Sequence, residues 1–323
     1  MSAATASQLA LWLIFGFAIA APAGVALLLL LGRLHVRQHA YEDAPQTHQA
    51  KTGTPTMGGI VFVVALVAAL GAVRVPMLLE LVALVVACAA IGAIDDVLKI
   101  RGGANRGLRA RTKLLATALA AVVFLRSLDA SGALFPRDVL FHAGTIWLAA
   151  PHWLWLLLGI LAITGTIHAV NLTDGLDGLA AGTMIPPLAV FAVIAAGLPE
   201  RAAYIGAAVG AGACVAFLAF NRHPAKLFMG DTGSLALGAL LSGVAILSGE
   251  MLLLVVVGGV FVAEALSVIL QVSYFKVTRG KRILRMSPLH HHFELAGWPE
   301  TKVTARFWLA SLICSLLGWT IAR

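Results

Sequence analysis

Long apolar segments alternate with short polar segments along almost the whole chain. A membrane-spanning helix needs about 20 apolar residues, and about ten segments reach that length: 9–32, 57–74, 76–94, 113–130, 148–167, 179–198, 202–220, 232–249, 251–275 and 303–321. Between them, region 131–147 contains Pro136, Arg137 and Asp138 and predicts a small external loop or hairpin. The pattern predicts an all-α polytopic membrane protein in which residues 1–323 form a single domain.

The composition agrees with this prediction. Of the 323 residues 60% are hydrophobic and only 12% are charged, and the mean hydropathy is +0.93, which excludes an ordinary soluble domain. The first apolar segment lacks a basic region and a clear small-residue cleavage site, so we expect a retained span and not a signal peptide. Cys88, Cys214 and Cys314 all lie in apolar runs and offer neither a disulfide framework nor metal-ligand spacing.

Lysine and arginine predict the orientation, because they concentrate in the cytoplasmic loops of membrane proteins. Loops 33–56, 95–112, 168–178, 221–231 and 276–302, with the adjacent span ends, hold every basic residue except Arg74, Arg126, Arg137, Arg201 and Arg323. We therefore expect these loops in the cytoplasm and both termini outside. The net charge of +8 then indicates a surface for membrane lipids and anionic substrates and no nucleic-acid partner, although orientation alone would explain most arginines.

The unusual polar clusters all fall on the predicted cytoplasmic side, which favours an interfacial enzyme with a cytoplasmic active-site cleft over a transporter. In the segment 168–178, Asn171, Asp174 and Asp177 recur at i, i+3 and i+6, and as a helix they would share one face. Gly175 and Gly178 let the backbone approach a ligand. The set suits a Mg²⁺-bound diphosphate or a nucleoside, and the alternative is a solvated loop with a helix cap.

Two further clusters lie earlier in the chain. The segment 51–59 combines the cation of Lys51 with a glycine- and proline-rich turn, which fits a phosphate or base but also a simple turn before a helix. The adjacent Asp95 and Asp96 diverge by about 100° on a helix, so they cannot bind one ion in the same way. One could act as a base or near a metal while the other holds a lysine; a helix end paired with Lys99 or Arg101 is the alternative.

Two clusters lie later in the chain. In the segment 221–234, Asp231 stands between two glycines where it could cap a helix, and Phe228 could stack on a base or pack at the membrane interface. Three consecutive histidines begin at His290 and lack the spacing of a zinc site, so phosphate or sugar binding fits better. Glu264, inside an apolar segment, supports a transporter, although a helix-to-helix hydrogen bond is the commoner role of such an acid.

Together these clusters resemble the polyprenyl-phosphate N-acetylhexosamine-1-phosphate transferases. The shared features are Gly-Thr-Pro-Thr-Met-Gly-Gly at 53–59, the Asp95–Asp96 pair, Asn-Leu-Thr-Asp-Gly-Leu-Asp-Gly at 171–178 and Gly-Asp-Thr-Gly-Ser at 230–234. Within that superfamily, Ser-Pro-Leu-His-His-His-Phe-Glu at 287–294 resembles the phospho-N-acetylmuramoyl-pentapeptide transferases, the MraY translocases. Enzymes that use other UDP-sugars, such as the N-acetylglucosamine-1-phosphate transferases, carry a different histidine pattern there.

The resemblance implies a reaction of peptidoglycan synthesis at the bacterial cytoplasmic (inner) membrane. UDP-N-acetylmuramoyl-pentapeptide (UDP-MurNAc-pentapeptide) and undecaprenyl phosphate would give lipid I and UMP, with Mg²⁺ as cofactor and a homodimer as the expected assembly. A transferase of N-acetylglucosamine-1-phosphate is the alternative.

The resemblance also implies roles for individual residues. The metal would lie at Asp231, and Asp95 and Asp96 would lie beside the lipid phosphate, with Asp95 as the more probable base and His290 as a further catalytic residue. The substrate contacts would be Lys51, Thr56, Lys113, Asn171, Asp174, Gly175, Asp177, Asn221, Phe228, His291 and His292.

Overall fold

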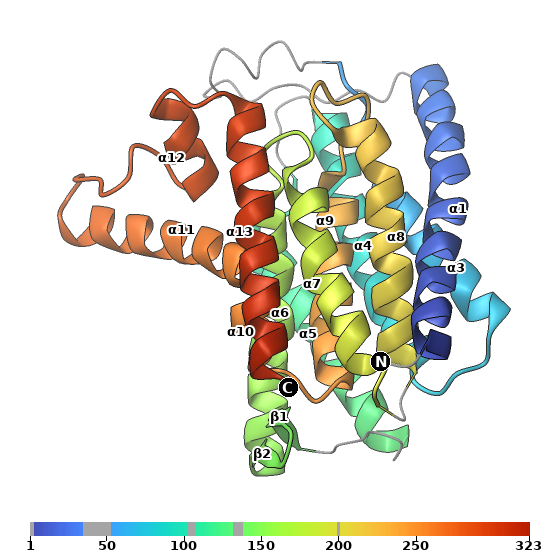
Figure 1. Cartoon of the computed structure of the whole chain (residues 1–323). Coiled ribbons are helices and arrows are strands. Elements are labelled where there is room, and N and C mark those ends of the chain that lie inside the picture. Colours follow the sequence, from blue (N-terminus) through green and yellow to red (C-terminus); the bar gives the residue numbers. More distant parts are fainter. Residues whose placement is uncertain (1–2, 35–52, 103–106, 132–137, 199–200) are drawn as a thin grey trace.

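The computed structural model describes residues 3–34, 53–102, 107–131, 138–198 and 201–323, and most of them are helical (Figure 1). Eight of the described helices are long and apolar enough to cross a membrane. They are α1 (Ala3–Leu34), α4 (Leu78–Gly102), α5 (Ala110–Ser131), α6 (His152–Thr173), α8 (Ala202–Asn221), α9 (Gly230–Leu247), α11 (Gly259–Val277) and α13 (Glu300–Ile321).

The remaining described elements are shorter. Two apolar helices, α3 (Ile60–Ala72) and α7 (Leu179–Ala195), pack within the bundle, and α10 (Leu253–Val257) and α12 (Leu289–Leu295) are short helices of five and seven residues. Strands β1 (Val139–Ala143) and β2 (Ile146–Ala149) form an antiparallel hairpin where a loop or hairpin was predicted. The polytopic helical class is confirmed, with the difference that the predicted span 251–275 is divided at Gly258 into α10 and α11.

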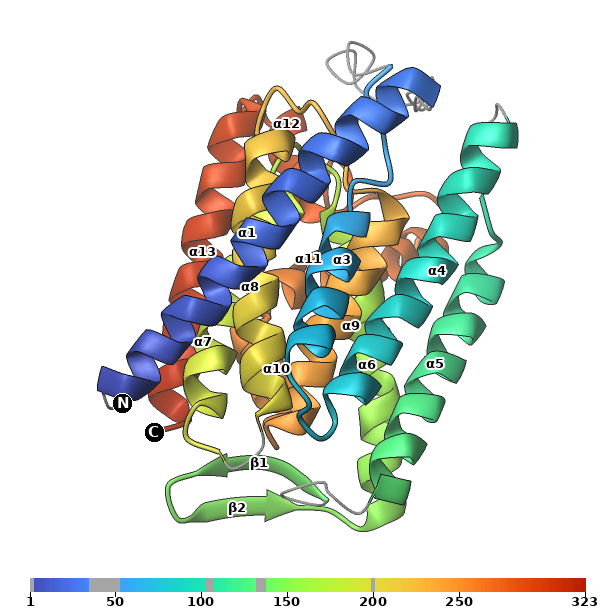
Figure 2. The ribbon, with the colours of Figure 1, turned by 90° about the vertical axis from the view of Figure 1, so that its right-hand side faces the viewer.

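Helix α9 forms the centre of the bundle. Every residue of α9 after Gly230 is buried, and the helix packs against α4, α6 and α8, while α1 crosses the outer face of α8 (Figure 2). The outer helices expose large apolar side chains, such as Leu11 of α1, Leu115 of α5 and Ile269 of α11. A lipid environment stabilises such an apolar outer surface, because lipid tails are as apolar as the side chains.

Glycines allow two helices to approach α9 closely. A Cβ atom added to Gly92 of α4 would lie 2.2 Å from the backbone oxygen of Asp231, and one added to Gly238 of α9 would lie 2.5 Å from Cα of Ile167 in α6. Small residues at helix contacts are the usual means of close packing between membrane helices. The close approach at Gly92 sets Asp95 and Asp96 beside the start of α9.

The two ends of the bundle differ. Helix α1 begins and α13 ends at the end that carries the β-hairpin, whereas α8 ends and α9 begins at the opposite end (Figure 1). The hairpin is held by the indole of Trp155, which donates to the oxygen of Val139 at 3.2 Å, and by the amide of Leu252, which donates to the oxygen of Leu140 at 2.9 Å. Helix α11 leans away from the bundle, and the chain then turns back so that α12 lies between α11 and α13 (Figure 1).

Two predicted helix ends were wrong. Helix α4 continues to Gly102, eight residues beyond the predicted end at 94, so Asp95 and Asp96 lie within a helix and do not stop it. Helix α6 continues to Thr173, beyond the predicted end at 167, and the backbone turns at Asp174. Asn171 is therefore helical, but Asp174 and Asp177 are not, and the predicted helical face of these three residues does not exist.

Candidate active site

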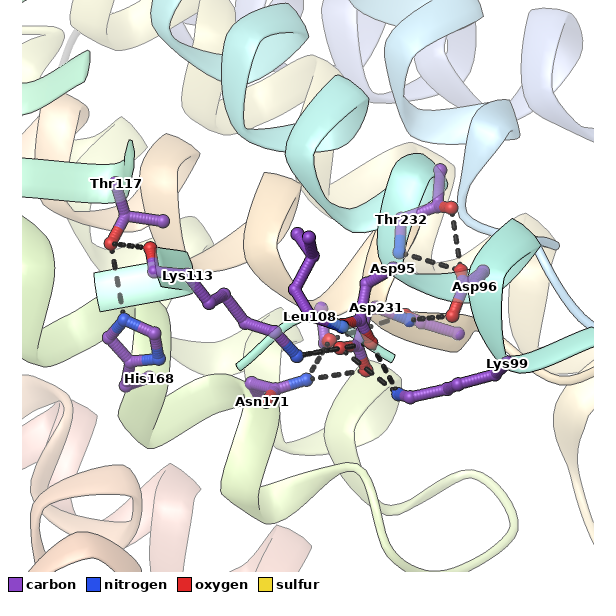
Figure 3. A network of polar contacts seen from close by, with 12 residues as sticks. Asp95, Asp96, Lys99, Leu108, Lys113, Thr117, His168, Asn171, Asp231 and Thr232 are labelled. Carbon is purple, nitrogen blue, oxygen red and sulfur yellow. Dashed lines mark hydrogen bonds and ion pairs between the residues drawn. The ribbon is translucent and has the colours of Figure 1, made fainter. Parts of the chain in front are cut away.

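Asp96 binds the first residues of α9. Its Oδ1 accepts a hydrogen bond from the amide of Asp231 at 3.0 Å, and its Oδ2 accepts from the amide of Thr232 at 3.0 Å and from the hydroxyl of Thr232 at 2.7 Å (Figure 3). These amides have no intrahelical acceptor, and a carboxylate at a helix start also interacts favourably with the helix dipole. Asp96 therefore fixes the position from which the Asp231 side chain projects.

Asp95 and Asp231 share two lysines (Figure 3). Oδ2 of Asp95 lies 2.6 Å from Nζ of Lys99 and 3.1 Å from Nζ of Lys113. Oδ2 of Asp231 lies 3.2 Å from Nζ of Lys99 and also accepts a hydrogen bond from Nζ of Lys113. Asp95 is fully buried and additionally accepts from the amide of Leu108 at 2.6 Å. Two cations and two carboxylates from α4, α5 and α9 thus form one compact cluster of balanced charge.

Asn171 connects this cluster to α6. Its Nδ2 donates to Oδ1 of Asp231 at 3.0 Å and to the hydroxyl of Ser234 at 2.8 Å. One turn earlier in α6, His168 Nε2 lies 3.1 Å from the hydroxyl of Thr117 in α5. Side chains of the helices α4, α5 and α6 therefore meet Asp231 at the start of α9.

Asp174 lies at the turn after α6. Burial raises the pKa of Asp174 to about 8, and the negative charges of Asp231 and Asp96 act in the same direction, while Lys99 opposes them. Although part of its surface remains exposed, the surrounding protein favours the uncharged carboxyl. Asp174 therefore adds negative charge to the cluster less readily than an ordinary carboxyl would.

A second set of contacts joins the turn at 174–178 to the segment after α8. Oδ2 of Asp177 accepts from Nδ1 of His223 at 3.1 Å and from the amide of Ala225 at 3.0 Å. Asn221 accepts from the amide of Gly178 at 3.0 Å and donates to the oxygen of Leu227 at 2.9 Å. The polar groups of Asp177 and Asn221 thus bind protein atoms, and these residues shape the two segments.

Phe228 and Thr56 lie where the segment 53–59 joins the segment before α9. The amide of Phe228 donates to the oxygen of Pro55 at 2.8 Å, and the oxygen of Phe228 accepts from the amide of Gly58 at 2.8 Å. The half-buried ring of Phe228 remains partly accessible. Thr56 is buried, and its hydroxyl has no hydrogen-bond partner within the described residues.

The three consecutive histidines point to different neighbours. His290 is fully buried and lies against Gly175, where an added Cβ would be only 2.2 Å from its Nε2. Nδ1 of His291 lies 2.7 Å from a carboxylate oxygen of Glu294, and Nδ1 of His292 accepts from the amide of Arg285 at 3.1 Å. Only His290 of the three therefore reaches the turn that follows Asp174.

The structure brings most of the predicted site residues to one end of the bundle, but Lys51 lies outside the described residues. Sequence reasoning missed the contacts of Thr232, Thr117, His223 and Glu300, although Thr232 and His223 lie within the segment 221–234 that it singled out. Thr232 directly follows Asp231, and hydroxyl residues at the first turn of a helix are common partners of acids, which was the available signal.

Three carboxylates could hold a metal ion. Ligand oxygens of Asp95, Asp96 and Asp231 all lie within 4.8 Å of one another. Oxygen donors of this kind suit Mg²⁺ or Ca²⁺ and not a metal that prefers sulfur or imidazole. Both oxygens of Asp96 accept hydrogen bonds from α9, whereas Oδ2 of Asp95 and Oδ2 of Asp231 contact the side chains of Lys99 and Lys113, which would have to move aside for an ion to bind there.

Known proteins resemble this chain over nearly its whole length. Residues 78–249 match the family model described as Glycosyl transferase family 4. The phospho-N-acetylmuramoyl-pentapeptide-transferase of Shouchella clausii is 43% identical over 314 residues, covering 95% of each chain. The enzyme of that name from Heliobacterium modesticaldum is 44% identical over 323 residues, covering 96% of this chain and 98% of its own. With this identity and coverage, the chain belongs to the phospho-N-acetylmuramoyl-pentapeptide-transferase family, within glycosyl transferase family 4.

Proposed function

We propose that this protein transfers phospho-N-acetylmuramoyl-pentapeptide from its UDP-linked donor to undecaprenyl phosphate, giving lipid I and UMP. The main observation that supports this proposal is the cluster of Asp95, Lys99, Lys113 and Asp231, found in a chain that belongs to this family. Such a cluster places cations and oxygen ligands together at one end of a membrane bundle, which suits two anionic phosphate substrates.

The reaction exchanges one phosphoanhydride for another. An oxygen of the lipid phosphate forms a bond to the sugar-linked phosphorus of the donor, and the bond from that phosphorus to UMP breaks. The protein must mainly position the reactants and offset their charges, because little other covalent chemistry is required. Lys99 and Lys113 supply the positive charge, and their shared carboxylates hold both ammonium groups in place.

Asp95 is the proposed partner of the lipid phosphate. A phosphate that is already ionised near neutral pH needs orientation more than deprotonation, so Asp95 acts chiefly through the lysines that it binds. Asp96 contributes by fixing the start of α9. His290, which lies against Gly175 beside Asp174, completes the proposed catalytic set.

Mg²⁺ is the proposed cofactor, with Asp231 as its main ligand and Asp95 as a neighbour. The bound ion would neutralise charge that develops on the diphosphate and on the leaving UMP. The donor set fits this ion, because Mg²⁺ prefers oxygen ligands and usually takes one or two carboxylates together with substrate phosphates. A cation nearby would lower the raised pKa of Asp174 and favour its ionised form.

The nucleoside and sugar would lie between the turn at 174–178 and the segment 221–228. Phe228 offers an accessible ring for stacking on uracil, while Asp177 and Asn221 hold the two segments in register. The further proposed substrate contacts are Lys51, Thr56, Lys113, Asn171, Asp174, Gly175, His291 and His292.

We also propose the bacterial cytoplasmic membrane as the location, with the acidic cluster on the cytoplasmic side, both termini outside and a homodimer as the assembly. The supporting observation is that the start of α1 and the end of α13 lie at the bundle end opposite the cluster (Figure 1). The basic residues around the cluster favour the same orientation.

The test is release of UMP by the purified protein in the presence of undecaprenyl phosphate and Mg²⁺. We expect release with UDP-N-acetylmuramoyl-pentapeptide and little with UDP-N-acetylglucosamine. Preferential turnover of UDP-N-acetylglucosamine would replace the proposed donor. Solute flux through proteoliposomes without UMP release would instead favour a transporter.

A further inference from the structure

Two buried polar side chains lie on one face of α11. Glu264 and Gln271 are seven residues apart, close to two helical turns, so their side chains leave the helix in nearly the same direction. Both are buried in a helix that leans away from the bundle (Figure 1). Both contact the backbone of the segment that follows α11, which leads to the histidine-bearing helix α12.

Glu264 binds the start of α12. Its Oε2 accepts a hydrogen bond from the amide of Leu289 at 2.8 Å, and its Oε1 accepts from the amide of His290 at 3.2 Å. These amides belong to the first turn of α12 and have no acceptor within the helix. A carboxylate inside a membrane helix is costly unless it is hydrogen-bonded, so the two amides also account for the burial of Glu264.

The same contact determines where His290 lies. Oε1 of Glu264 is 3.2 Å from Nδ1 of the imidazole. On the other side of the ring, Nε2 lies so close to Gly175 that an added Cβ would be 2.2 Å away. The ring is thus enclosed between a carboxylate of α11 and the turn that follows Asp174, and a shift of α12 would move it away from that turn.

We propose that Glu264 is a positioning residue, which holds the start of α12 and thereby sets His290 against Gly175. It acts through the backbone and the imidazole and touches neither substrate. A buried acid in a membrane helix can indicate a transporter. The burial of Glu264 is explained by its contacts with α12 and needs no such role. The consequence for catalysis rests on the proposed function, because that function makes His290 a catalytic residue. The contact between Glu264 and α12 does not depend on the proposed function.

Hydrogen–deuterium exchange tests the contact independently of activity. In the full-length protein in detergent, Glu264→Ala should make the amides of Leu289 and His290 exchange about tenfold faster or more, because both lose a charged acceptor. Gln271→Ala is the matched control. Gln271 Oε1 accepts from the amides of Ile283 and Leu284, so exchange should increase there and not at 289–290. Unchanged exchange at 289–290 in Glu264→Ala would refute the contact.

A variant of nearly equal size covers the case in which the alanine variant does not fold. Glu264→Gln keeps one carbonyl oxygen as an acceptor but presents an NH₂ group in place of the other, so one of the two amides should exchange faster. Protection of both amides equal to that of the wild type would contradict the proposal.

Kinetics test the consequence for His290. Glu264→Ala should lower kcat for UMP release by about tenfold or more, as small displacements of catalytic groups do, while the Kd for UMP changes less than about twofold. Because Glu264 acts through His290, adding Glu264→Ala to His290→Ala should reduce kcat no further. Additive losses would overturn the positioning role. Absence of UMP release by the wild type would overturn the proposed function alone, since the exchange result would still stand.

Discussion

Asp95 and Asp96 are neighbours in the sequence, but they bind different parts of the molecule. Asp95 binds two lysines, whereas Asp96 binds the start of α9. This division follows from the angle of about 100° between adjacent side chains on a helix. The sequence predicted that one of the pair would hold a lysine, and that residue is Asp95, which the resemblance implies as the base. Substitution of Asp95 should therefore release the two lysines, whereas substitution of Asp96 should free the start of α9.

Asp231 is the residue on which most of the site converges. We expect Asp231→Asn to lower Mg²⁺-dependent UMP release by about 100-fold or more, a typical loss for one electrostatic catalytic group. The amide lacks the charge that a metal and two lysines require, but it keeps the shape of the carboxylate, so the protein should remain folded. Activity and thermal denaturation of the purified variant in detergent measure both effects.

The control for this substitution is Asp129→Asn. Asp129 also pairs with a basic residue, with 3.3 Å between its Oδ2 and Nη1 of Arg126, but it lies at the far end of α5 from the cluster. Its replacement should leave UMP release unchanged. Full activity of Asp231→Asn would refute the metal role of Asp231.

At the scale of helices, apolar length predicts where a segment crosses the membrane and not where the helix ends. Helices α4 and α6 continue past the apolar segments because polar residues at their ends find partners in neighbouring helices, as Asn171 does with Asp231. Such partners lie far away in the sequence. A single sequence therefore predicts the helices and their polar ends but not the contacts between them.

The close packing of α4 on α9 is a property of Gly92 that can be tested. We expect Gly92→Ala to destabilise the protein by about 1–3 kcal/mol, the usual cost of overpacking, and to lower UMP release, because a Cβ would meet the backbone of Asp231 at 2.2 Å. The comparison is Gly71→Ala in α3, where an added Cβ meets nothing within 4 Å. Equal melting temperatures and activities of the two variants would show that the close approach is unimportant.

The β-hairpin packs over a buried acid. Glu250 is fully buried, its Oε1 lies 3.3 Å from Nδ1 of His142 in β1, and burial raises the pKa of Glu250 to about 8 from an ordinary value of 4.5. Below pH 4.5 both folded and unfolded chains hold the proton. Between pH 4.5 and 8 the unfolded chain releases it first, so the free energy of unfolding falls as pH rises, by at most about 1.4 kcal/mol per pH unit.

Glu250→Gln should remove this dependence. The amide cannot ionise, so the melting temperature of the variant relative to wild type should increase from about pH 5 to pH 8 and then remain constant. Thermal denaturation in detergent at several pH values measures the difference. A difference that is independent of pH would mean that Glu250 is already ionised in the folded protein.

For the whole molecule, the sequence predicts the helical membrane class and the polar end of the bundle, because both depend on local composition. The sequence does not predict that Glu264 binds the start of α12. The two residues in contact belong to different helices, so no periodic pattern along one helix indicates the contact. The motifs identified the family by resemblance, and the resemblance implies that Asp177 and Asn221 contact the substrate. The motifs did not predict that both residues also bind protein atoms of neighbouring segments.

Orientation in the membrane is the prediction that links the fold to the reaction. The proposed UDP-linked donor is a cytoplasmic metabolite, so we expect the lysine–carboxylate cluster to face the cytoplasm and the β-hairpin to face the outside. Thr145, between β1 and β2, and Lys226, between α8 and α9, are both exposed. The hairpin and the connection from α8 to α9 lie at opposite ends of the bundle (Figure 1). In a background with Cys88, Cys214 and Cys314 replaced by alanine, Thr145→Cys should react with a membrane-impermeant maleimide on intact cells. Lys226→Cys should react only after the membrane is opened. The reverse pattern would place the lysine–carboxylate cluster outside the cell, away from any nucleotide donor, and would contradict both the orientation and the proposed reaction.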